Sequence, residues 1–376
     1  MNSKKKFIFT MLSIFLGFIV GGIIILSIGK SPMQAYKTII LGVVGKPQYI
    51  SWTIVKAIPI ILTGISVAFA FNTGLFNIGA EGQYIVGGIG ALIAGYFLEL
   101  PPIIHPIVAL LFGMLFGAIW GAVVGFLKAK FNVNEVISSI MMNWIAFYSS
   151  NYLLSFNAFR KPESDQSYDV LESAKTIFLG KWKLSEAGQA FLKTKPVLKQ
   201  FLRPPLNWGF IIAIIAAIVI WYILNRTTLG YQLKAVGFNK DAAEYGGIDV
   251  KKNTVYSMTI AGLLSGLAGA AMLLGVSHHI GVMASLQGYG FDGMAVSLIA
   301  SNNPILCIPA GLLYAGLEYG GSKLTSAMNT PTEVVNILTG AIVFFIAMPK
   351  LFEMIRLLFT KKGAKKVENK LLIYLQ

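Results

Sequence analysis

Charged residues are scarce in this sequence, and their scarcity excludes several classes of protein. Asp, Glu, Lys and Arg make up 12% of the 376 residues, about half of their usual share in a soluble domain. Hydrophobic residues make up 55%, and the mean hydropathy is +0.69. A soluble protein cannot cover its surface with so few charges. The composition therefore excludes a cytosolic enzyme, a disordered chain and a repeat solenoid, and it predicts a protein that crosses a membrane several times.

Cysteine and the common catalytic motifs are also absent or nearly so. The single cysteine, Cys307, excludes intrachain disulfides and cysteine-rich metal sites. No GxxxxGK[ST], HExxH, CxxC or GxSxG motif occurs. His278 and His279 are adjacent, so on a helix their side chains point about 100° apart and cannot hold one metal together. We therefore predict no catalytic residue, no metal site and no cofactor in this chain. If the protein uses ATP, another chain must bind it.

Ten apolar segments approach the length that a membrane span requires, which is roughly 20 helical residues for a hydrocarbon core of about 30 Å. The predicted spans are 7–28, 52–71, 80–98, 104–127, 137–156, 208–224, 254–276, 288–301, 304–321 and 334–357. The eighth is short and contains several glycines, so we expect a broken span there. The sequence thus predicts an all-α, polytopic transmembrane helical bundle that forms a single domain over 1–376.

Basic residues outnumber acidic ones by 31 to 16, and their positions predict the orientation of the spans. In a soluble protein this excess would point to nucleic acid, but here we expect contact with membrane lipid and not with nucleic acid. With both termini in the cytoplasm, most basic residues of the short loops fall on the cytoplasmic side. This orientation makes 157–207 an extracellular loop and 225–253 a cytoplasmic loop. The lysines within 29–50 fit it least well.

The 157–207 loop is the one sizeable polar insertion in the sequence. Basic residues dominate it, five acidic residues lie among them, and Pro204 and Pro205 come near its end. Two interpretations stay open. The loop is either a docking surface for another protein or a surface loop without a partner.

A polar, glycine-containing segment joins the second and third spans over 71–83. It holds Asn72, Asn77, Glu81 and Gln83. Backbone that glycine frees at membrane depth is tolerated only where protein or water satisfies it, and a carboxylate is costly in lipid. We interpret the segment as a broken-helix element on a substrate pathway. The alternative is a tight cytoplasmic turn followed by a capped helix.

A similar break opens the eighth span at 288–293, where Asp292 lies among glycines. If spans two to five and seven to ten form two halves, the breaks occur in corresponding helices. Five crossings separate the halves, so their topology is inverted. Paired glycine-interrupted segments in inverted repeats point to a transport pathway.

The segment 132–144 adds a polar stripe to an apolar helix. Asn132 or Asn134 can cap the helix, and Ser139 and Asn143 lie four residues apart on one face. Such a stripe either joins helices or lines a path. The predicted pathway residues are Asn72, Asn77, Glu81, Gln83, Ser139, Asn143 and Asp292.

A short helix outside the membrane is predicted in the 225–253 loop. Asn239 supplies an N-cap, and Gly246 and Gly247 end the helix. We expect Ala242, Ala243 and Tyr245 to be exposed on it, an arrangement that suits docking into a groove of a partner. A structured turn without a partner is the alternative. The predicted docking residues are Asn239, Asp241, Ala242, Ala243, Glu244, Tyr245, Gly246 and Gly247.

Four blocks of sequence together resemble a known family. They are 74–83, 134–139, 235–248 and 290–297. In this order and spacing they resemble the membrane permease subunits of ABC importers for ribose, branched-chain amino acids and nucleosides, and most of all the nucleoside (guanosine-type) branch. The resemblance covers about 50–350. Gly246-Gly247 and Asn302-Asn303-Pro304 depart from the usual residues of the family.

The resemblance implies a function and a set of partners. The chain would be a permease subunit of a nucleoside importer in the bacterial plasma membrane, with 239–248 as its coupling helix. The partners would be an ATPase subunit with paired nucleotide-binding domains, a second homologous permease that is preferably a different chain, and an extracellular substrate-binding lipoprotein.

Three other functions stay open at this point. An importer permease of this kind could carry a sugar or a branched-chain amino acid. In an ion-coupled secondary transporter, Glu81, Asp292 and Glu318 would be proton or sodium sites. The third alternative is a structural component that only anchors other subunits.

Overall fold

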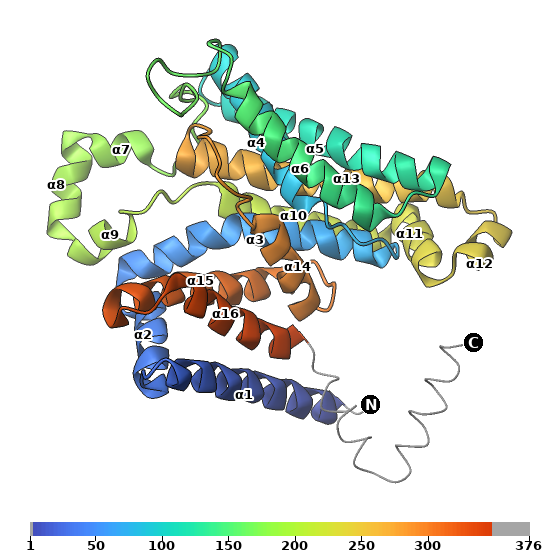
Figure 1. Ribbon diagram of the computed structural model, residues 1–376. Helices are drawn as coiled ribbons and strands as arrows, with labels where there is room; N and C mark the ends of the chain where they lie inside the picture. The colour runs from blue at the N-terminus through green and yellow to red at the C-terminus, as the bar shows by residue number, and fades with distance from the viewer. Residues whose placement is uncertain (1–2, 348–376) are drawn as a thin grey trace, which may run out of the picture. The chain divides into compact units, whose positions relative to one another are not determined.

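A computed structural model describes residues 3–347 of the chain, with side chains over 15–346 (Figure 1). The elements of this part are α1 Ser3–Ser27, α2 Pro32–Val44, α3 Pro47–Asn72, α4 Ala80–Phe97, α5 Ile104–Phe131, α6 Glu135–Leu153, α7 Gly180–Leu184, α8 Glu186–Thr194, α9 Pro196–Phe201, α10 Gly209–Arg226, α11 Thr228–Phe238, α12 Lys240–Tyr245, α13 Val250–Met272 with the π-helical turn η1 Leu273–Ser277, α14 Tyr289–Ile299, α15 Cys307–Met328 and α16 Thr332–Ala347. In these residues the strand-like pairing amounts to three isolated bridges. The all-α prediction is confirmed.

Four helices of the described part are long and apolar enough to cross a bilayer: α3, α5, α10 and α13 continued through η1. A fifth candidate consists of Phe15–Ser27 and α2, which pass the same test together although they are bent by 115°. Such a bent pair is either a broken span or a re-entrant loop. The polytopic helical bundle is therefore confirmed, whereas the number of ten crossings and the inverted halves stay predictions.

Most of the predicted spans coincide with helices. The broken span at 288–301 corresponds to α14, whose 11 residues are too few to cross a bilayer alone. The prediction missed α2, because a helix of 13 residues is too short for a rule based on span length. The last predicted span, 334–357, begins with α16, and its part beyond 347 lies outside the described residues.

The chain divides into two compact units. One comprises the residues up to Gly42 together with those from Gly320 on, and the other runs from Val43 to Tyr319. Within the first unit α1 packs against α16. A Cβ atom added to Gly21 would lie 2.5 Å from Leu338 Cδ1, so the two helices approach closely there. The expectation of a single domain stays a prediction.

Glycines bring α5 and α13 into close contact in the larger unit. A Cβ atom on Gly117 would lie 2.4 Å from the carbonyl oxygen of Gly262, and one on Gly262 would lie 2.3 Å from that of Gly117. Four glycines of α5 follow each other at intervals of four residues, at 113, 117, 121 and 125. Small residues at this spacing let membrane helices approach backbone to backbone, so van der Waals contacts hold the pair together.

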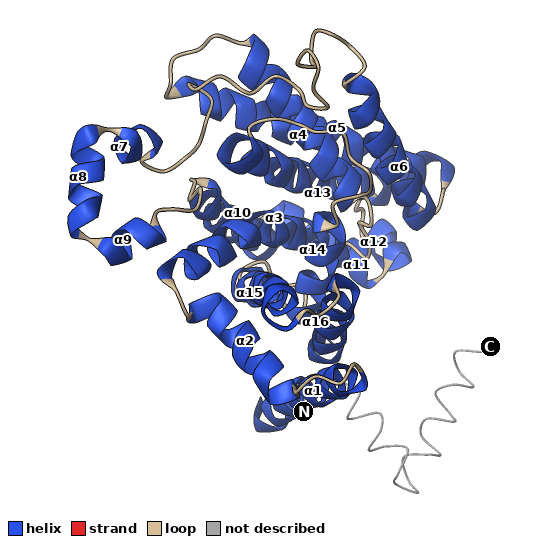
Figure 2. Cartoon of the chain, turned by 60° about the vertical axis from the view of Figure 1, so that its left-hand side comes forward, coloured by secondary structure: helices blue, strands red, loops and turns tan. Residues whose placement is uncertain are grey.

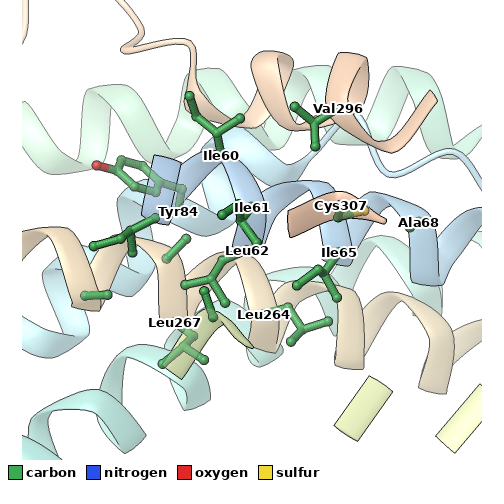
Figure 3. Packing of buried hydrophobic residues seen from close by; sticks show 14 of the residues in the cluster. Ile60, Ile61, Leu62, Ile65, Ala68, Tyr84, Leu264, Leu267, Val296 and Cys307 are labelled. Carbon is green, nitrogen blue, oxygen red and sulfur yellow. The ribbon is translucent and has the colours of Figure 1, made fainter. Parts of the chain in front are cut away.

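The helix α3 lies in the centre of the larger unit. It is hydrophobic around its whole circumference, and Ile58, Ile61 and Ile65 are fully buried. A helix that is apolar on every face is expected in the interior. Figure 3 shows its side chains between Leu264 of α13 and Val296 of α14.

Two small helical segments lie at opposite ends of the larger unit. The helices α7–α9 belong to the 157–207 loop, and α12 belongs to the 225–253 loop. Figures 1 and 2 both show α7–α9 and α12 on opposite sides of the helices between them. The side of the membrane that each loop faces stays a prediction.

Candidate functional site

The two glycine-containing breaks predicted in separate halves of the sequence meet in the structure. Glu81, in the first turn of α4, is fully buried, and its carboxylate accepts hydrogen bonds from the backbone N–H groups of Gly288 (2.8 Å) and Gly290 (2.6 Å). These groups lie at the N-terminus of α14, where backbone donors have no partner within the helix. A carboxylate is also favoured there by the helix dipole. Glu81 is therefore a cap for α14 that comes from α4.

Glycine is required where these two segments touch. A Cβ atom on Gly290 would lie 2.2 Å from the backbone nitrogen of Glu81. Gly288 has a φ of +92°, a conformation that glycine adopts at little cost. Of the glycines that interrupt the eighth predicted span, Gly290 is thus needed for the contact with α4 and Gly288 for its own backbone conformation.

Asn77 and Gln83 bind each other. Each amide donates to the carbonyl oxygen of the other, at 2.9 and 3.0 Å, and both side chains are fully buried. The amide of Asn77 also donates to Ser66 Oγ on α3 (3.1 Å), which accepts a further hydrogen bond from Ser265 of α13 (2.9 Å). These amides join α3, α4 and α13 in the interior of the bundle.

The polar stripe of α6 faces the start of α4. Asn143 Oδ1 accepts a hydrogen bond from the backbone N–H of Gly82 (2.8 Å), and its amide donates to the carbonyl oxygen of Ile78 (3.0 Å). Asn143 therefore caps α4 from a neighbouring helix. Ser139 is fully buried on the same face, and its hydroxyl has no partner among the described residues.

Asn72 and Asp292 have other partners. The Asn72 amide donates to the carbonyl oxygens of Ala68 (2.7 Å) and Asn302 (3.2 Å). Asp292 Oδ1 accepts a hydrogen bond from the Tyr314 hydroxyl at 2.5 Å. Both side chains thus hold helices in place, and their role on a substrate pathway stays a prediction.

Glu318 forms an ion pair within the helical bundle. Its carboxylate lies 2.7 Å from Lys56 Nζ on α3. The two side chains are 30% and 34% exposed, and the second carboxylate oxygen of Glu318 has no partner among the described residues.

A cavity of about 350 Å³ lies next to these groups. Its walls come from α4, α6, α13 with η1, the loop that follows η1, and α14. Polar atoms in its lining include those of five side chains: Tyr84, Ser150, His279, Gln287 and Tyr289. Of the seven predicted pathway residues, none is among the residues that line it. Two of them, Glu81 and Asn143, connect helices that form its walls.

The residues that line this cavity could have been found from their positions in the sequence, although a search for charged and amide side chains misses them. Ser150 lies seven residues after Asn143 and so continues the polar stripe of α6 on the same face. Tyr84 follows directly after the polar segment 71–83, and Tyr289 lies between the two glycines that Glu81 binds.

The 157–207 segment contacts the loop that borders the cavity. The backbone N–H of Ser167 donates to the carbonyl oxygen of Ile280 (2.8 Å), and that of Val282 donates to Asp165 (2.9 Å). Asp169 lies 3.3 Å from His279 Nδ1 and accepts a hydrogen bond from Lys161 (2.8 Å). The hydrogen bond from Lys161 holds the pKa of Asp169 below its usual value.

The short helix predicted after Asn239 is present as α12. The Asn239 side chain accepts a hydrogen bond from the backbone N–H of Ala242 at 3.0 Å, and Gly247 has a φ of +80° just after the helix ends. Tyr245 is 97% exposed, and Phe238, at the end of α11, is 90% exposed. Two large side chains thus project from this segment, and its role in docking a partner stays a prediction.

One detail of that prediction is wrong. Ala243 is buried, with 5% of its surface exposed, whereas Ala242, Glu244 and Tyr245 are exposed. The reason is that α12 lies on the rest of the chain with one face, and Ala243 is on that face. The prediction also missed α11, which begins at Thr228 and is capped by the side chain of Thr227.

An ion pair connects α5 and α6 near α12. Lys128 Nζ lies 2.9 Å from Glu135, in the first turn of α6. Partial burial acts to raise the pKa of Glu135, but the hydrogen bond and the charge of Lys128, helped by the charge of Lys240, outweigh it, so the pKa lies below its usual value. Asn134 caps α6 as predicted, through the backbone N–H of Val136 at 2.8 Å.

Comparison with known proteins identifies relatives along almost the whole chain. Residues 49–347 match the family described as "Branched-chain amino acid transport system / permease component". The guanosine ABC transporter permease protein NupP of Bacillus subtilis is 37% identical over 94% of this chain and 97% of its own length. The nucleoside ABC transporter permease protein NupB of Lactococcus lactis is 34% identical over 94% of this chain and 93% of its own length. The guanosine ABC transporter permease protein NupQ of Bacillus subtilis is 26% identical over 70% of this chain and 78% of its own length.

Proposed function

Because the chain belongs to the family of branched-chain amino acid transport system permease components, we propose that it is the permease subunit of an ATP-driven ABC importer that carries a nucleoside across the bacterial plasma membrane. The observation that carries this proposal is the 37% identity with a guanosine permease protein over 94% of the chain. A second relative at 34% identity has a name that specifies nucleosides.

We further propose that the importer contains two different permease chains. Bacillus subtilis has two guanosine permease proteins that resemble this chain, at 37% and 26% identity. Two unequal relatives in one organism support a pair in which this chain corresponds to the more similar member. The remaining partners would be an ATPase subunit with paired nucleotide-binding domains and an extracellular substrate-binding lipoprotein.

In this proposal α12 is the coupling helix that receives the movement of the ATPase. Its support is the exposure of Tyr245 and Phe238 on a capped, rigid segment at one end of the larger unit. ATP binding would close the two nucleotide domains, and the helix would pass that displacement to α11 and α13, with which it is in contact. The permease would then alternate between two states that the partners bind unequally.

The buried polar groups support an importer driven by ATP over an ion-coupled transporter. Two backbone N–H groups bind the two oxygens of Glu81, the Tyr314 hydroxyl binds Asp292, and Lys56 pairs with one oxygen of Glu318, whose other oxygen has no partner among the described residues. Because both oxygens of Glu81 are bound to backbone N–H groups, this carboxylate has little need for a bound proton or sodium ion. The α7–α9 end, opposite α12, would face the lipoprotein, with both chain termini in the cytoplasm.

Uptake by the reconstituted importer tests this function. Proteoliposomes would contain this chain, a second permease, the ATPase subunit and the binding lipoprotein, with ATP inside and labelled guanosine outside. We expect uptake that requires ATP, persists with a protonophore, and is reduced by excess unlabelled nucleoside but not by glucose or leucine. Uptake that a protonophore abolishes and that continues without the ATPase would contradict the proposal. Competition by glucose alone would identify a sugar importer.

A further inference from the structure

The cavity of about 350 Å³ lies within the range of small-molecule sites, near its lower end. We propose that this cavity is the substrate chamber of the permease, in which the base of a nucleoside stacks on Tyr84 and Tyr289 and a polar group of the nucleoside hydrogen-bonds to Ser150. The inference rests on the proposed function and adds to it the place and the chemistry of binding.

Two aromatic rings form one wall of the chamber. The ring centroids of Tyr84 on α4 and Tyr289 on α14 lie 5.3 Å apart, with an angle of 49° between the ring planes. Every nucleobase has a flat π-face, so stacking on an aromatic side chain holds it without reading its identity. A wall of this kind suits an importer that accepts several nucleosides.

Glu81 sets the position of both rings. Tyr84 follows it by one turn of α4, and Tyr289 lies between Gly288 and Gly290, whose N–H groups the carboxylate binds. The backbone carbonyl of Tyr289 also accepts a hydrogen bond from Thr63 of α3 at 2.9 Å. Breaking the contact between Glu81 and α14 would separate the rings, so the same contact that joins α4 to α14 determines whether the aromatic wall is assembled.

Ser150 supplies an unused hydrogen-bonding group. Its side chain is 1% exposed, its hydroxyl has no partner among the described residues, and it lines the chamber. A buried hydroxyl without a partner is unfavourable, and most buried polar atoms in proteins are paired. A ligand hydroxyl or amide in the chamber would satisfy it.

The remaining lining groups favour a neutral ligand. Tyr84, Tyr289 and His279 are the titratable residues of the lining, and no Asp, Glu, Lys or Arg is among the residues that form it. The amide of Gln287 and the imidazole of His279 can donate and accept hydrogen bonds. The charges of an amino acid zwitterion or a phosphorylated nucleotide would find no residue of opposite charge in this lining. A nucleoside is neutral and needs none.

The experiment measures guanosine uptake by the four-component importer in proteoliposomes, with variants of this chain. We expect Tyr84→Leu and Tyr289→Leu to lower the kcat of uptake at least about tenfold through the loss of stacking. The KM for the loaded binding lipoprotein should stay unchanged, because docking uses other surfaces. The Tyr84→Phe and Tyr289→Phe variants should lose much less kcat than the Leu variants, since the ring face is kept.

Ser150→Ala separates a ligand contact from a structural role. If Ser150 binds only the ligand, removing its unpaired hydroxyl should lower kcat about fivefold while the Tm of the detergent-solubilised protein stays equal or rises. Tyr152→Leu is the matched control for the two Tyr→Leu variants of the chamber, because Tyr152 is 67% exposed on α6 and does not line the chamber. A lower Tm for Ser150→Ala would indicate a structural role and contradict the inference.

The outcomes distinguish the chamber from the function. If the parent takes up guanosine and the Leu and Ala variants equal Tyr152→Leu, the chamber is wrong and the importer stands. If the parent takes up a sugar instead and the Leu variants lower that uptake, the proposed nucleoside function and the base stacking are both wrong. If no solute is taken up although ATPase activity is present, the importer function itself is overturned, and the chamber with it.

Discussion

The region around the start of α4 and the segment around α12 are both rich in polar residues, but these residues are buried in the first and exposed in the second. In the first, Glu81, Asn77 and Asn143 are buried, and their hydrogen-bonding groups are paired with other helices. In the second, Glu244 and Tyr245 point into solvent, and Asn239 forms only its local cap. The buried groups hold the bundle together, and the exposed ones are available to another chain.

The comparison shows how to interpret polar residues in a membrane protein. Polar groups at membrane depth are costly, so their presence suggests function. In this chain the buried ones are mostly occupied by caps and helix contacts, and the residues that line the cavity are their neighbours Tyr84, Ser150 and Tyr289. Loss of a buried, paired group should therefore lower stability more than loss of an exposed one.

Loss of the Glu81 carboxylate should have the largest effect. Glu81→Ala leaves two buried N–H groups at the start of α14 without an acceptor, at about 1–3 kcal/mol each. We expect a fall in Tm of the detergent-solubilised protein, with a smaller fall for Glu81→Gln, which keeps one acceptor oxygen. Glu244→Ala, which removes an exposed carboxylate, serves as the control and should leave the Tm unchanged. Equal Tm values for the two Ala variants would contradict the capping role.

The pair of amides should show coupling in a double-mutant cycle. Asn77 and Gln83 share two hydrogen bonds, so Asn77→Ala, Gln83→Ala and the double variant should be non-additive in unfolding free energy, by about 1–2 kcal/mol. The cycle can be measured by urea unfolding in detergent. The control is a second cycle with Asn225→Ala and Lys234→Ala, which removes one exposed hydrogen bond. Its coupling free energy should be well below that of Asn77 and Gln83. Additive values for Asn77 and Gln83 would show that the pair contributes nothing.

The Lys128–Glu135 ion pair should make a smaller contribution that depends on pH. Because the pKa of Glu135 is lowered in the folded protein, its contribution is complete above the unfolded value of about 4.3 and disappears as the pH falls through the folded value. A partly exposed pair contributes about 0–1 kcal/mol. Unfolding measured from pH 6 to pH 3 should show a loss in the parent that Glu135→Gln lacks. Parallel curves for the two proteins would rule the contribution out.

The α12 variants should affect stability least and transport most. Tyr245→Ala removes a side chain that is 97% exposed, so we expect a change in unfolding free energy within about 0.5 kcal/mol. Uptake should nevertheless be uncoupled from ATP hydrolysis, measured as transported guanosine per ATP. Tyr222→Ala, at a position 56% exposed on α10, is the control. An unchanged coupling ratio in Tyr245→Ala would contradict the docking role of α12.

The buried Ala243 changes how that role should be tested. Replacing it with Arg would place a charged side chain against the rest of the chain, so a loss of uptake would not separate docking from misfolding. Glu244→Arg reverses an exposed charge on the same helix and leaves the packing intact. We expect it to uncouple uptake without lowering the Tm.

Features encoded within a few residues could be predicted from the sequence. The cap at Asn239 and the glycines after α12 are examples, as are the cap at Asn134 and the shared face of Ser139 and Asn143. Each depends on hydrogen bonds or spacing within one helical turn, which a short pattern contains. The burial of Ala243 was mispredicted, because a six-residue helix does not show which of its faces rests on the remaining chain.

The sequence by itself determined the class of protein, the positions of most helices and their local caps, because apolar length and capping patterns act over short distances along the chain. The tertiary structure alone decided which groups those polar residues bind. Glu81 and Gly288 lie 207 residues apart, and their contact depends on how closely glycines let α4 and α14 approach. The cavity beside them is likewise bounded by four helices and a loop, so its shape and its unpaired Ser150 hydroxyl exist only once those elements have packed.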